Sequence, residues 1–142
     1  MQSQRKIKII FDTNWYISAS INKKSRQIFY RNILNSEKFE IYYSNDLLKE
    51  YKTVIARKKF SKYISQNQVN RLLSILLPKL KKTNSLHYFG VRNIKDNYLI
   101  GMCKACKPKF LITGDKDLLE MSVYEKTIIL TMRQFLEIIQ FL

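Results

Sequence analysis

Short apolar runs alternate along this chain with longer segments in which apolar residues recur at helical spacing. The runs cover residues 7–11, 39–44, 110–113 and 127–131, and each is short enough to be one strand buried on both faces. A strand–helix–strand alternation places parallel strands in one sheet with helices on its two faces. The sequence therefore predicts a three-layer α/β/α fold with a central, mostly parallel sheet of four to five strands.

Helical patterns fill most of the chain between these runs. Two helical pieces, interrupted near NKKS, are expected within residues 15–34. Four further predicted helices cover residues 45–59, 65–82, 95–107 and 132–142. In each of these four, the apolar residues lie along one stripe, and Pro78 is expected to end or kink the helix 65–82. Because no repeat and no linker interrupts the pattern, a single domain over residues 1–142 is expected.

The chain is strongly basic. Lysine and arginine total 26 against 11 acidic residues, which gives a formal net charge of +15. Aromatic residues stand between the basic ones, a pattern that predicts affinity for a polyanion, with bases stacked on exposed rings. Basicity alone also fits a ribosome-associated or DNA-binding protein. A solvated, lysine-rich face with its aromatic residues turned into the core is the alternative.

Nothing in the sequence predicts a membrane protein or a disulfide-rich secreted one. No apolar run is long enough to cross a bilayer, and the apolar stretch near the N-terminus is too short for a signal peptide, so we expect a cytoplasmic protein. The two cysteines, Cys103 and Cys106, lie late on the apolar side of a predicted helix. That position favours buried core thiols over a redox pair.

Two aspartates stand where predicted strands end. Asp12 directly follows the run 7–11, and Asp115 follows the run 110–113 after a single glycine. The carboxyl ends of parallel strands meet at one edge of the sheet, which is where ligands bind in such folds. We therefore expect these two carboxylates to lie close together at that edge.

Three further acids are candidates for the same place. Asp96 begins the helical pattern 96–103 on its apolar side, and the helix dipole explains an acid there but not its inward direction. Glu50 lies at the border of an apolar stripe, where a surface glutamate paired with Lys49 or Lys52 is the alternative. Asp117 is a ligand, a supporting residue, or an acid in the first turn of a short helix.

Carboxylates gathered in one crevice need a compensating charge. Two unit charges about 4 Å apart repel by roughly 4 kcal/mol at an effective dielectric constant near 20. Carboxylates at a sheet edge are the natural ligands of Mg²⁺ or Mn²⁺. The sequence therefore predicts that one of these cations binds among the acids.

The order and spacing of these motifs resemble those of the PIN-domain nucleases, particularly the branch of toxin components of toxin–antitoxin pairs. The segments that carry the resemblance are FDTNWYISA, YYSNDLLKEYKTVIARKKF, VRNIKDNYLIGMCKACKPKFLITGDKDLL and IILTMRQFLEII. Together they span nearly the whole chain. The family's fold has the same arrangement, a parallel sheet between two layers of helices.

The resemblance implies a metal-dependent endoribonuclease that acts on single-stranded or structured RNA. By matching position, the acidic quartet that binds Mg²⁺ or Mn²⁺ consists of Asp12, Glu50, Asp96 and Asp115. Asp117 lies close by, and Asn14 and Thr113 match polar residues that support the acids. The resemblance also implies a cognate antitoxin and a homodimer as partners. One departure is that Asn93 and Ile94 replace an aspartate and a proline that often precede the third acid.

Three other functions fit parts of this pattern, one of them an interaction protein whose function is its complex with a partner. A non-catalytic RNA-binding module would keep the fold and the basic surface, but an intact acidic quartet argues against loss of activity. A phosphatase or phosphotransferase of another doubly wound fold also has an aspartate after its first strand. A nucleophilic aspartate of the haloacid-dehalogenase kind is normally followed two residues later by a second aspartate, and here Asn14 occupies that position.

Overall fold

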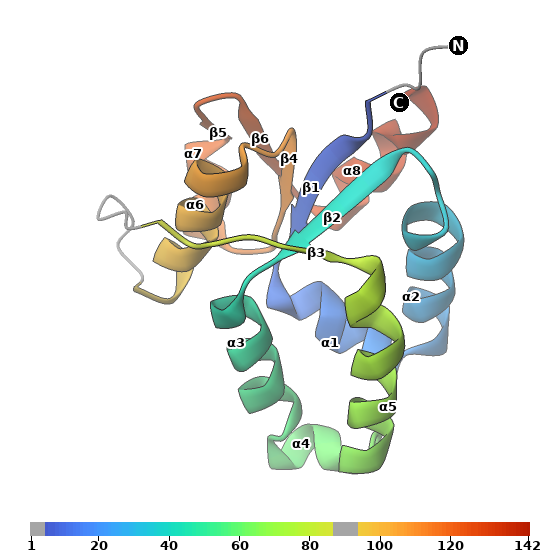
Figure 1. The fold of residues 1–142 in the computed structure, drawn as a ribbon. Coiled ribbons are helices and arrows are strands. Elements are labelled where there is room, and N and C mark those ends of the chain that lie inside the picture. Colours follow the sequence, from blue (N-terminus) through green and yellow to red (C-terminus); the bar gives the residue numbers. More distant parts are fainter. Residues whose placement is uncertain (1–4, 87–93) are drawn as a thin grey trace.

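The computed structural model describes residues 5–86 and 94–142, and of residues 94–97 it describes the backbone alone. Its centre is a six-stranded sheet (Figure 1). The strands are β1 (Ile7–Phe11), β2 (Phe39–Tyr43), β3 (Lys81–Lys82), β4 (Phe110–Ile112), β5 (Val123–Tyr124) and β6 (Thr127–Leu130). Their order is β3-β2-β1-β4-β6-β5, and every neighbouring pair is parallel except β5 and β6.

The predicted α/β fold with its mostly parallel sheet is confirmed, and the strand number is corrected to six. The two additional strands are β3 and β5, which have two residues each and form the two edges of the sheet. Two residues are too few to show a period of any kind. The four apolar runs of the sequence form β1, β2, β4 and β6. The segment LHYFGV, expected to be a weak strand or a loop, lies outside the described residues from residue 87 on.

Helices follow the strands in the expected alternation. The helical elements are α1 (Thr13–Ile21), α2 (Lys23–Ile28), the π-helix η1 (Phe29–Leu34), α3 (Asn45–Ile55), α4 (Lys58–Ser61), α5 (Gln66–Leu76), the 3₁₀ turn η2 (Leu77–Lys79), α6 (Ile94–Cys106), α7 (Lys116–Met121), α8 (Met132–Ile138) and the 3₁₀ turn η3 (Ile139–Phe141). Ser65 and Thr131 begin α5 and α8 with complete capping boxes, which satisfy backbone N–H groups at each start. The α-helical part ends at Leu76, two residues before Pro78, as the sequence predicted.

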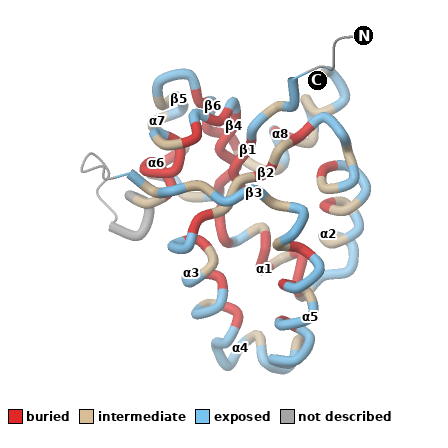
Figure 2. Tube along the Cα trace, viewed as in Figure 1, coloured by how far each residue is buried: buried red, intermediate tan, exposed pale blue. Residues whose placement is uncertain are grey.

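Most residues of the central strands β1 and β4 are buried, as Figure 2 shows. On one face, the ring of Phe135 from α8 packs against Phe11, Phe39 and Phe110, with ring centroids 6.0, 5.6 and 5.7 Å apart. Lys8 alternates with its neighbours on β1 and points to the other face, where its Nζ lies 3.5 Å from the carbonyl oxygen of the last residue of α6. The sheet therefore has helices on both sides.

The helices α3, α4 and α5 extend away from the sheet beyond the carboxyl ends of its parallel strands (Figure 1). The side chain of Ser44 accepts the Leu47 N–H at 3.2 Å and begins α3 directly after β2. Cys103 and Cys106 are both buried and free, which confirms the prediction that they are core residues. None of the helices within the described ranges is long and apolar enough to span a bilayer.

Candidate functional site

Asp12 lies at the point where β1 ends and α1 begins. Its backbone N–H donates to the Ile112 carbonyl oxygen at 2.8 Å, so β1 and β4 end side by side. Its Oδ1 accepts the Thr13 N–H at 2.6 Å, which makes Asp12 the N-cap of α1. Only 8% of Asp12 is exposed. The backbone and the helix terminus thus hold a buried carboxylate at the carboxyl edge of the sheet.

Thr113 connects this carboxylate with the neighbouring turn. Its hydroxyl donates to Asp12 Oδ2 at 2.6 Å and accepts the Asp115 N–H at 3.1 Å. Asp115 in turn is the N-cap of α7, because its Oδ1 accepts the Leu118 N–H at 3.1 Å. The structure therefore brings Asp12 and Asp115 to the same edge, with Thr113 between them, as the sequence predicted.

Replacing Thr113 by valine tests this connection. The isosteric change removes the hydroxyl that donates to the buried Asp12 carboxylate, and hydrogen bonds to charged groups contribute about 1.5–3 kcal/mol. We expect the free energy of unfolding to fall by about that amount in a urea titration at neutral pH without metal. Thr113→Ser, which keeps the hydroxyl, is the matched control, and equal losses in the two variants would contradict the assignment.

Glu50 reaches the site from α3 through a tyrosine. Tyr98 on α6 donates its hydroxyl hydrogen to Glu50 Oε2, and the same hydroxyl lies 3.2 Å from Thr13 Oγ1 at the start of α1. Ser85 Oγ donates to the Tyr98 carbonyl oxygen at 2.8 Å. Among the described residues no lysine or arginine forms an ion pair with Glu50, so the surface pairing with Lys49 or Lys52 is not what the structure shows.

Tyr98 and Thr13 were missed by the sequence analysis. A tyrosine in an amphipathic helix is most often a core residue, and Tyr98 is indeed half-buried and packed against the hydrophobic core. The one signal that could have singled it out is its position two residues after Asp96. Burial and the bond to Glu50 raise the pKa of the Tyr98 hydroxyl, so at neutral pH it is protonated and donates.

The acids act on one another electrostatically. Burial raises the pKa of Asp12, and the carboxylates of Glu50 and Asp115 raise it further, while the bonds from Thr113 and Thr13 lower it. Three carboxylates from β1, α3 and the β4–α7 turn therefore share one region of the molecule. In the described part of the chain, none of the three forms an ion pair with lysine or arginine.

The other residues that the sequence predicted for the site are Asp96, Asp117 and Asn14. Asp96 is in the first turn of α6, which begins one residue before the predicted range 95–107, and its side chain lies outside the described residues. Asp117 is half-buried in the first turn of α7. Asn14 is exposed and lines a hollow of about 300 Å³ beside Asp12, together with Arg133 from α8.

These residues have the chemistry of a site for a hard divalent cation. Carboxylate oxygens are the ligands that Mg²⁺ and Mn²⁺ prefer, and Mg²⁺ is usually held by one or two carboxylates and several waters. Among the described residues, no group of three or more histidine, cysteine, aspartate or glutamate side chains is placed to hold a metal ion by direct contact. Asp12, Glu50 and Asp115 supply oxygens of the kind that such a cation binds, and a hydrated cation held by one or two carboxylates does not need a group of three.

Comparison with known proteins gives two matches. Residues 8–117 match the PIN domain family. An uncharacterized protein of Methanocaldococcus jannaschii is 32% identical over 118 residues, which are 82% of this chain and 76% of that protein. No solved structure matches the chain at a comparable level of significance. The family match extends from β1 to the start of α7 and contains every acid discussed above.

Proposed function

This chain belongs to the PIN domain family, and on that premise we propose that it is an endoribonuclease that depends on Mg²⁺ or Mn²⁺. PIN domains are generally metal-dependent nucleases. One observation supports the proposal most: the Asp12 carboxylate is buried beside two other carboxylates and has no lysine or arginine partner in the described part of the chain. This occurs in a chain with 26 such residues available.

The energetics of this arrangement favour a bound cation. Burial and like charge both destabilise an ionised carboxylate, and the described surroundings of Asp12 offset this only through hydrogen bonds from Thr113 and Thr13. A divalent cation between Asp12, Glu50 and Asp115 would offset the desolvation of the buried charge and the repulsion among the three. We propose Asp96 as a fourth acid of this set, with Asp117 beside it.

A bound Mg²⁺ or Mn²⁺ supplies charge compensation and a water of lowered pKa for attack on a phosphodiester. The chain's own residues position that chemistry. Thr113 orients Asp12 through Oδ2, and Tyr98 orients Glu50 through Oε2. Water adds across the bond between phosphorus and the 3′ oxygen, and because the 2′-hydroxyl takes no part, the products carry 5′-phosphate and 3′-hydroxyl ends.

The direct test is cleavage of a labelled single-stranded RNA with Mn²⁺ and with EDTA. We expect cleavage only with Mn²⁺, and we expect Asp115→Asn to lower the rate by at least about a hundredfold, since even residues that support metal ligands contribute 10–100-fold. Glu120→Gln, an exposed acid in the same helix α7, is the matched control and should cleave normally. Equal cleavage with EDTA would refute the proposal.

Tyr98→Phe tests the residue that the structure adds to the site. Without the hydroxyl, Glu50 loses its described partner, and we expect about ten- to hundredfold weaker Mn²⁺ binding and a similar loss of cleavage. Tyr51→Phe is the control, because Tyr51 also loses a buried hydroxyl contact, 2.7 Å to Ser20 Oγ. Calorimetric titration with Mn²⁺ separates the two, and equal Mn²⁺ affinity in both variants would show that Tyr98 has only a structural role.

The resemblance to the toxin branch supports a narrower role, and we propose that this nuclease is the toxin of a toxin–antitoxin pair. Its partners would then be RNA, a small antitoxin that blocks the site, and a second copy of the chain. Expression of the protein alone is expected to arrest growth, and co-expression of a short neighbouring reading frame to relieve it. Growth that is unaffected by the active protein would contradict the toxin role and leave the nuclease proposal intact.

A further inference from the structure

The net charge is not distributed evenly over the chain, because the acidic residues are concentrated in some segments and absent from others. Residues 51–86 contain no aspartate or glutamate. The same segment contains nine basic residues, all exposed: Lys52, Arg57, Lys58, Lys59, Lys62, Arg71, Lys79, Lys81 and Lys82. We call residues 52–82 the basic arm; it comprises the end of α3, then α4, α5, η2 and β3. Because the segment itself contains no acid, its own charge is strongly positive, and only acids from other elements can offset it.

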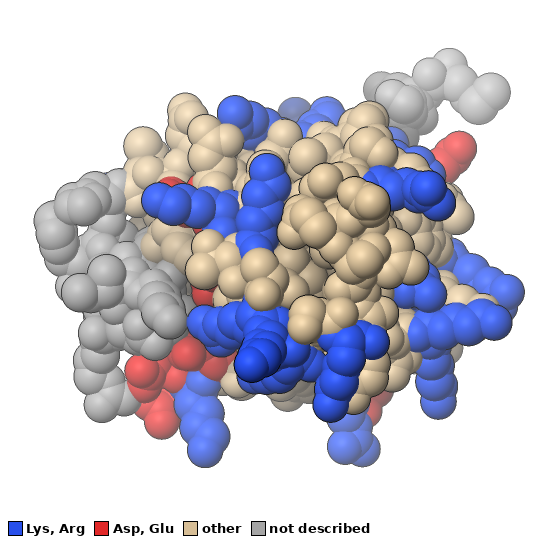
Figure 3. Space-filling model, turned by 90° about the horizontal axis from the view of Figure 1, so that it is seen from below, with Lys and Arg blue, Asp and Glu red and all other residues tan. Residues whose placement is uncertain are grey.

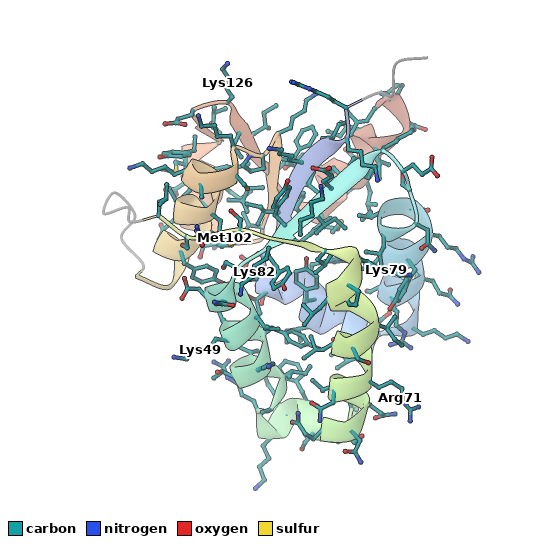
Figure 4. All side chains as sticks on the ribbon, in the orientation of Figure 1. Lys49, Arg71, Lys79, Lys82, Met102 and Lys126 are labelled. Carbon is teal, nitrogen blue, oxygen red and sulfur yellow. The ribbon has the colours of Figure 1, made fainter. Side chains whose placement is uncertain are left out.

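The arm lies at the edge of the sheet that carries the acids. Figure 3 looks at the molecule from this end. Lysine and arginine side chains spread over the face, and the largest group of acidic ones lies at its lower left. In Figure 4, Lys82 on β3 and Lys79 and Arg71 beside α5 lie on the same half of the molecule as Lys49 of α3, whereas Lys126 lies at the opposite end of the molecule.

Both ends of the arm lead to the candidate site. Lys52 follows Glu50 by two residues on α3. At the other end, the chain leaves β3 at Lys82 and reaches Ser85, whose hydroxyl bonds to the backbone of Tyr98. The charge of Lys81 is already paired, because its Nζ forms an ion pair with Glu40 at 2.9 Å. The other eight basic side chains of the arm form the surface considered for binding.

We propose that the basic arm is the surface that binds the sugar–phosphate backbone of a single-stranded RNA and leads it to the acidic site. The inference rests on the proposed function. It adds the surface on which the RNA substrate binds and the single-stranded state in which it binds there. Lysine and arginine neutralise phosphates whatever the base sequence, and exposed aromatic rings add stacking with unpaired bases. Tyr63, which directly follows Lys62 at the end of α4, is 60% exposed and provides such a ring.

The chain contains a matched set of lysines for the test. Lys6, Lys109 and Lys126 are exposed and directly precede β1, β4 and β6. These strands are parallel to one another, so the three lysines lie at the amino edge, opposite the arm. Lys58, Lys59 and Lys62 lie on or next to α4 in the arm. Reversing either set of three to glutamate changes the net charge by the same amount.

Binding is measured by fluorescence anisotropy with a labelled single-stranded RNA of about 15 nucleotides, in EDTA so that no cleavage occurs, over a range of KCl concentrations. We expect Lys58→Glu, Lys59→Glu and Lys62→Glu together to weaken binding at least tenfold and to reduce the slope of log K against log[KCl] by about 2, since each phosphate contact contributes about 0.7. The amino-edge triple variant is expected to bind within about threefold of the wild type. Equal weakening by both sets, or no weakening by the arm set, would overturn the proposal.

A second pair of variants tests the single-stranded form of the ligand. Tyr63→Ala is expected to weaken binding of the single strand about tenfold, whereas Tyr63→Phe keeps the ring and the affinity. Binding of an RNA duplex of the same length should be unaffected by either variant, because its bases are already stacked on one another. Single-stranded DNA of the same sequence shows how much the sugar–phosphate backbone alone contributes to the affinity. Equal effects of Tyr63→Ala on single strand and duplex would overturn this part of the inference.

These measurements do not depend on catalysis. If the wild-type protein fails to cleave RNA with Mn²⁺ but the arm variant alone loses binding, the nuclease proposal is refuted and the arm is supported. If cleavage occurs and both triple variants bind like the wild type, the arm is refuted and the nuclease is supported. Circular dichroism melts verify folding, which charge changes at these exposed positions should leave intact, and the triple glutamine variant of the arm repeats the test with a smaller change.

Discussion

Replacing Asp12 by asparagine is expected to lower RNA cleavage at least a hundredfold and, without metal, to make the folded protein more stable. Asparagine keeps the size of the side chain and its Oδ1, which can still accept the Thr13 N–H that begins α1. It removes the negative charge that a divalent cation requires. Since residues that merely support metal ligands contribute 10–100-fold, the loss of a proposed ligand should exceed that range.

The stability change follows from the direction of the pKa shift. Burial raises the pKa of Asp12 above 3.8 in the folded protein, so the folded state binds this proton more tightly than the unfolded state. The stability that the protonated carboxyl contributes is therefore fully present below pH 3.8. It is lost as the pH rises through the pKa that Asp12 has in the folded protein. The asparagine variant has no such loss. Its free energy of unfolding should therefore exceed that of the wild type by a growing amount as the pH rises from 3.8 to the pKa of Asp12 in the folded protein.

Thermal melts of both proteins in EDTA, from about pH 4 to pH 7, measure this difference, because the interval starts near the ordinary aspartate value. Asp46→Asn is the matched control: it removes one negative charge from an exposed position in the first turn of α3 and should leave cleavage unchanged. An Asp12→Asn protein that cleaves RNA at the wild-type rate would show that the reaction takes place elsewhere.

The second large effect concerns metal binding in the absence of RNA. A ligand that binds only the folded state, at 100 times its dissociation constant, stabilises the protein by about 2.7 kcal/mol. For a domain of this size such a gain raises the melting temperature by roughly 5–10 °C. We expect Mn²⁺ to produce a shift of this order in the wild type, and KCl at equal ionic strength to produce none.

Variants of the acids then show which of them bind the ion. Asp12→Asn and Asp115→Asn should each lose most of the Mn²⁺-dependent shift, and Asp96→Asn decides whether the acid of α6 belongs to the set. Exposed Glu120→Gln is the control. A melting temperature that is indifferent to Mn²⁺ in the wild type would refute the metal proposal without reference to any activity assay.

Much of the fold followed from local patterns. The apolar runs at β1 and β4 are buried on both faces, with Ile9, Ile10 and Leu111 fully buried, because a strand between two layers of helices meets no water on either side. The helical stripes of α3 and α5 and the stop before Pro78 are set by the same short-range geometry. Asp12 and Asp115 could be placed at one edge because parallel strands align their carboxyl ends.

The sequence by itself therefore determined the features that depend on neighbours along the chain. These are the strands long enough to show a pattern, the helices, the edge that two aspartates share, and the basic composition. The tertiary structure alone decided which distant side chains touch. Residues 50 and 98 are 48 positions apart, and no periodicity connects Glu50 with the Tyr98 hydroxyl. The two-residue edge strands likewise exist only because a neighbouring strand offers them hydrogen bonds. Contacts of this kind arise from the packing of whole elements, and a pattern read along one element contains no information about the other.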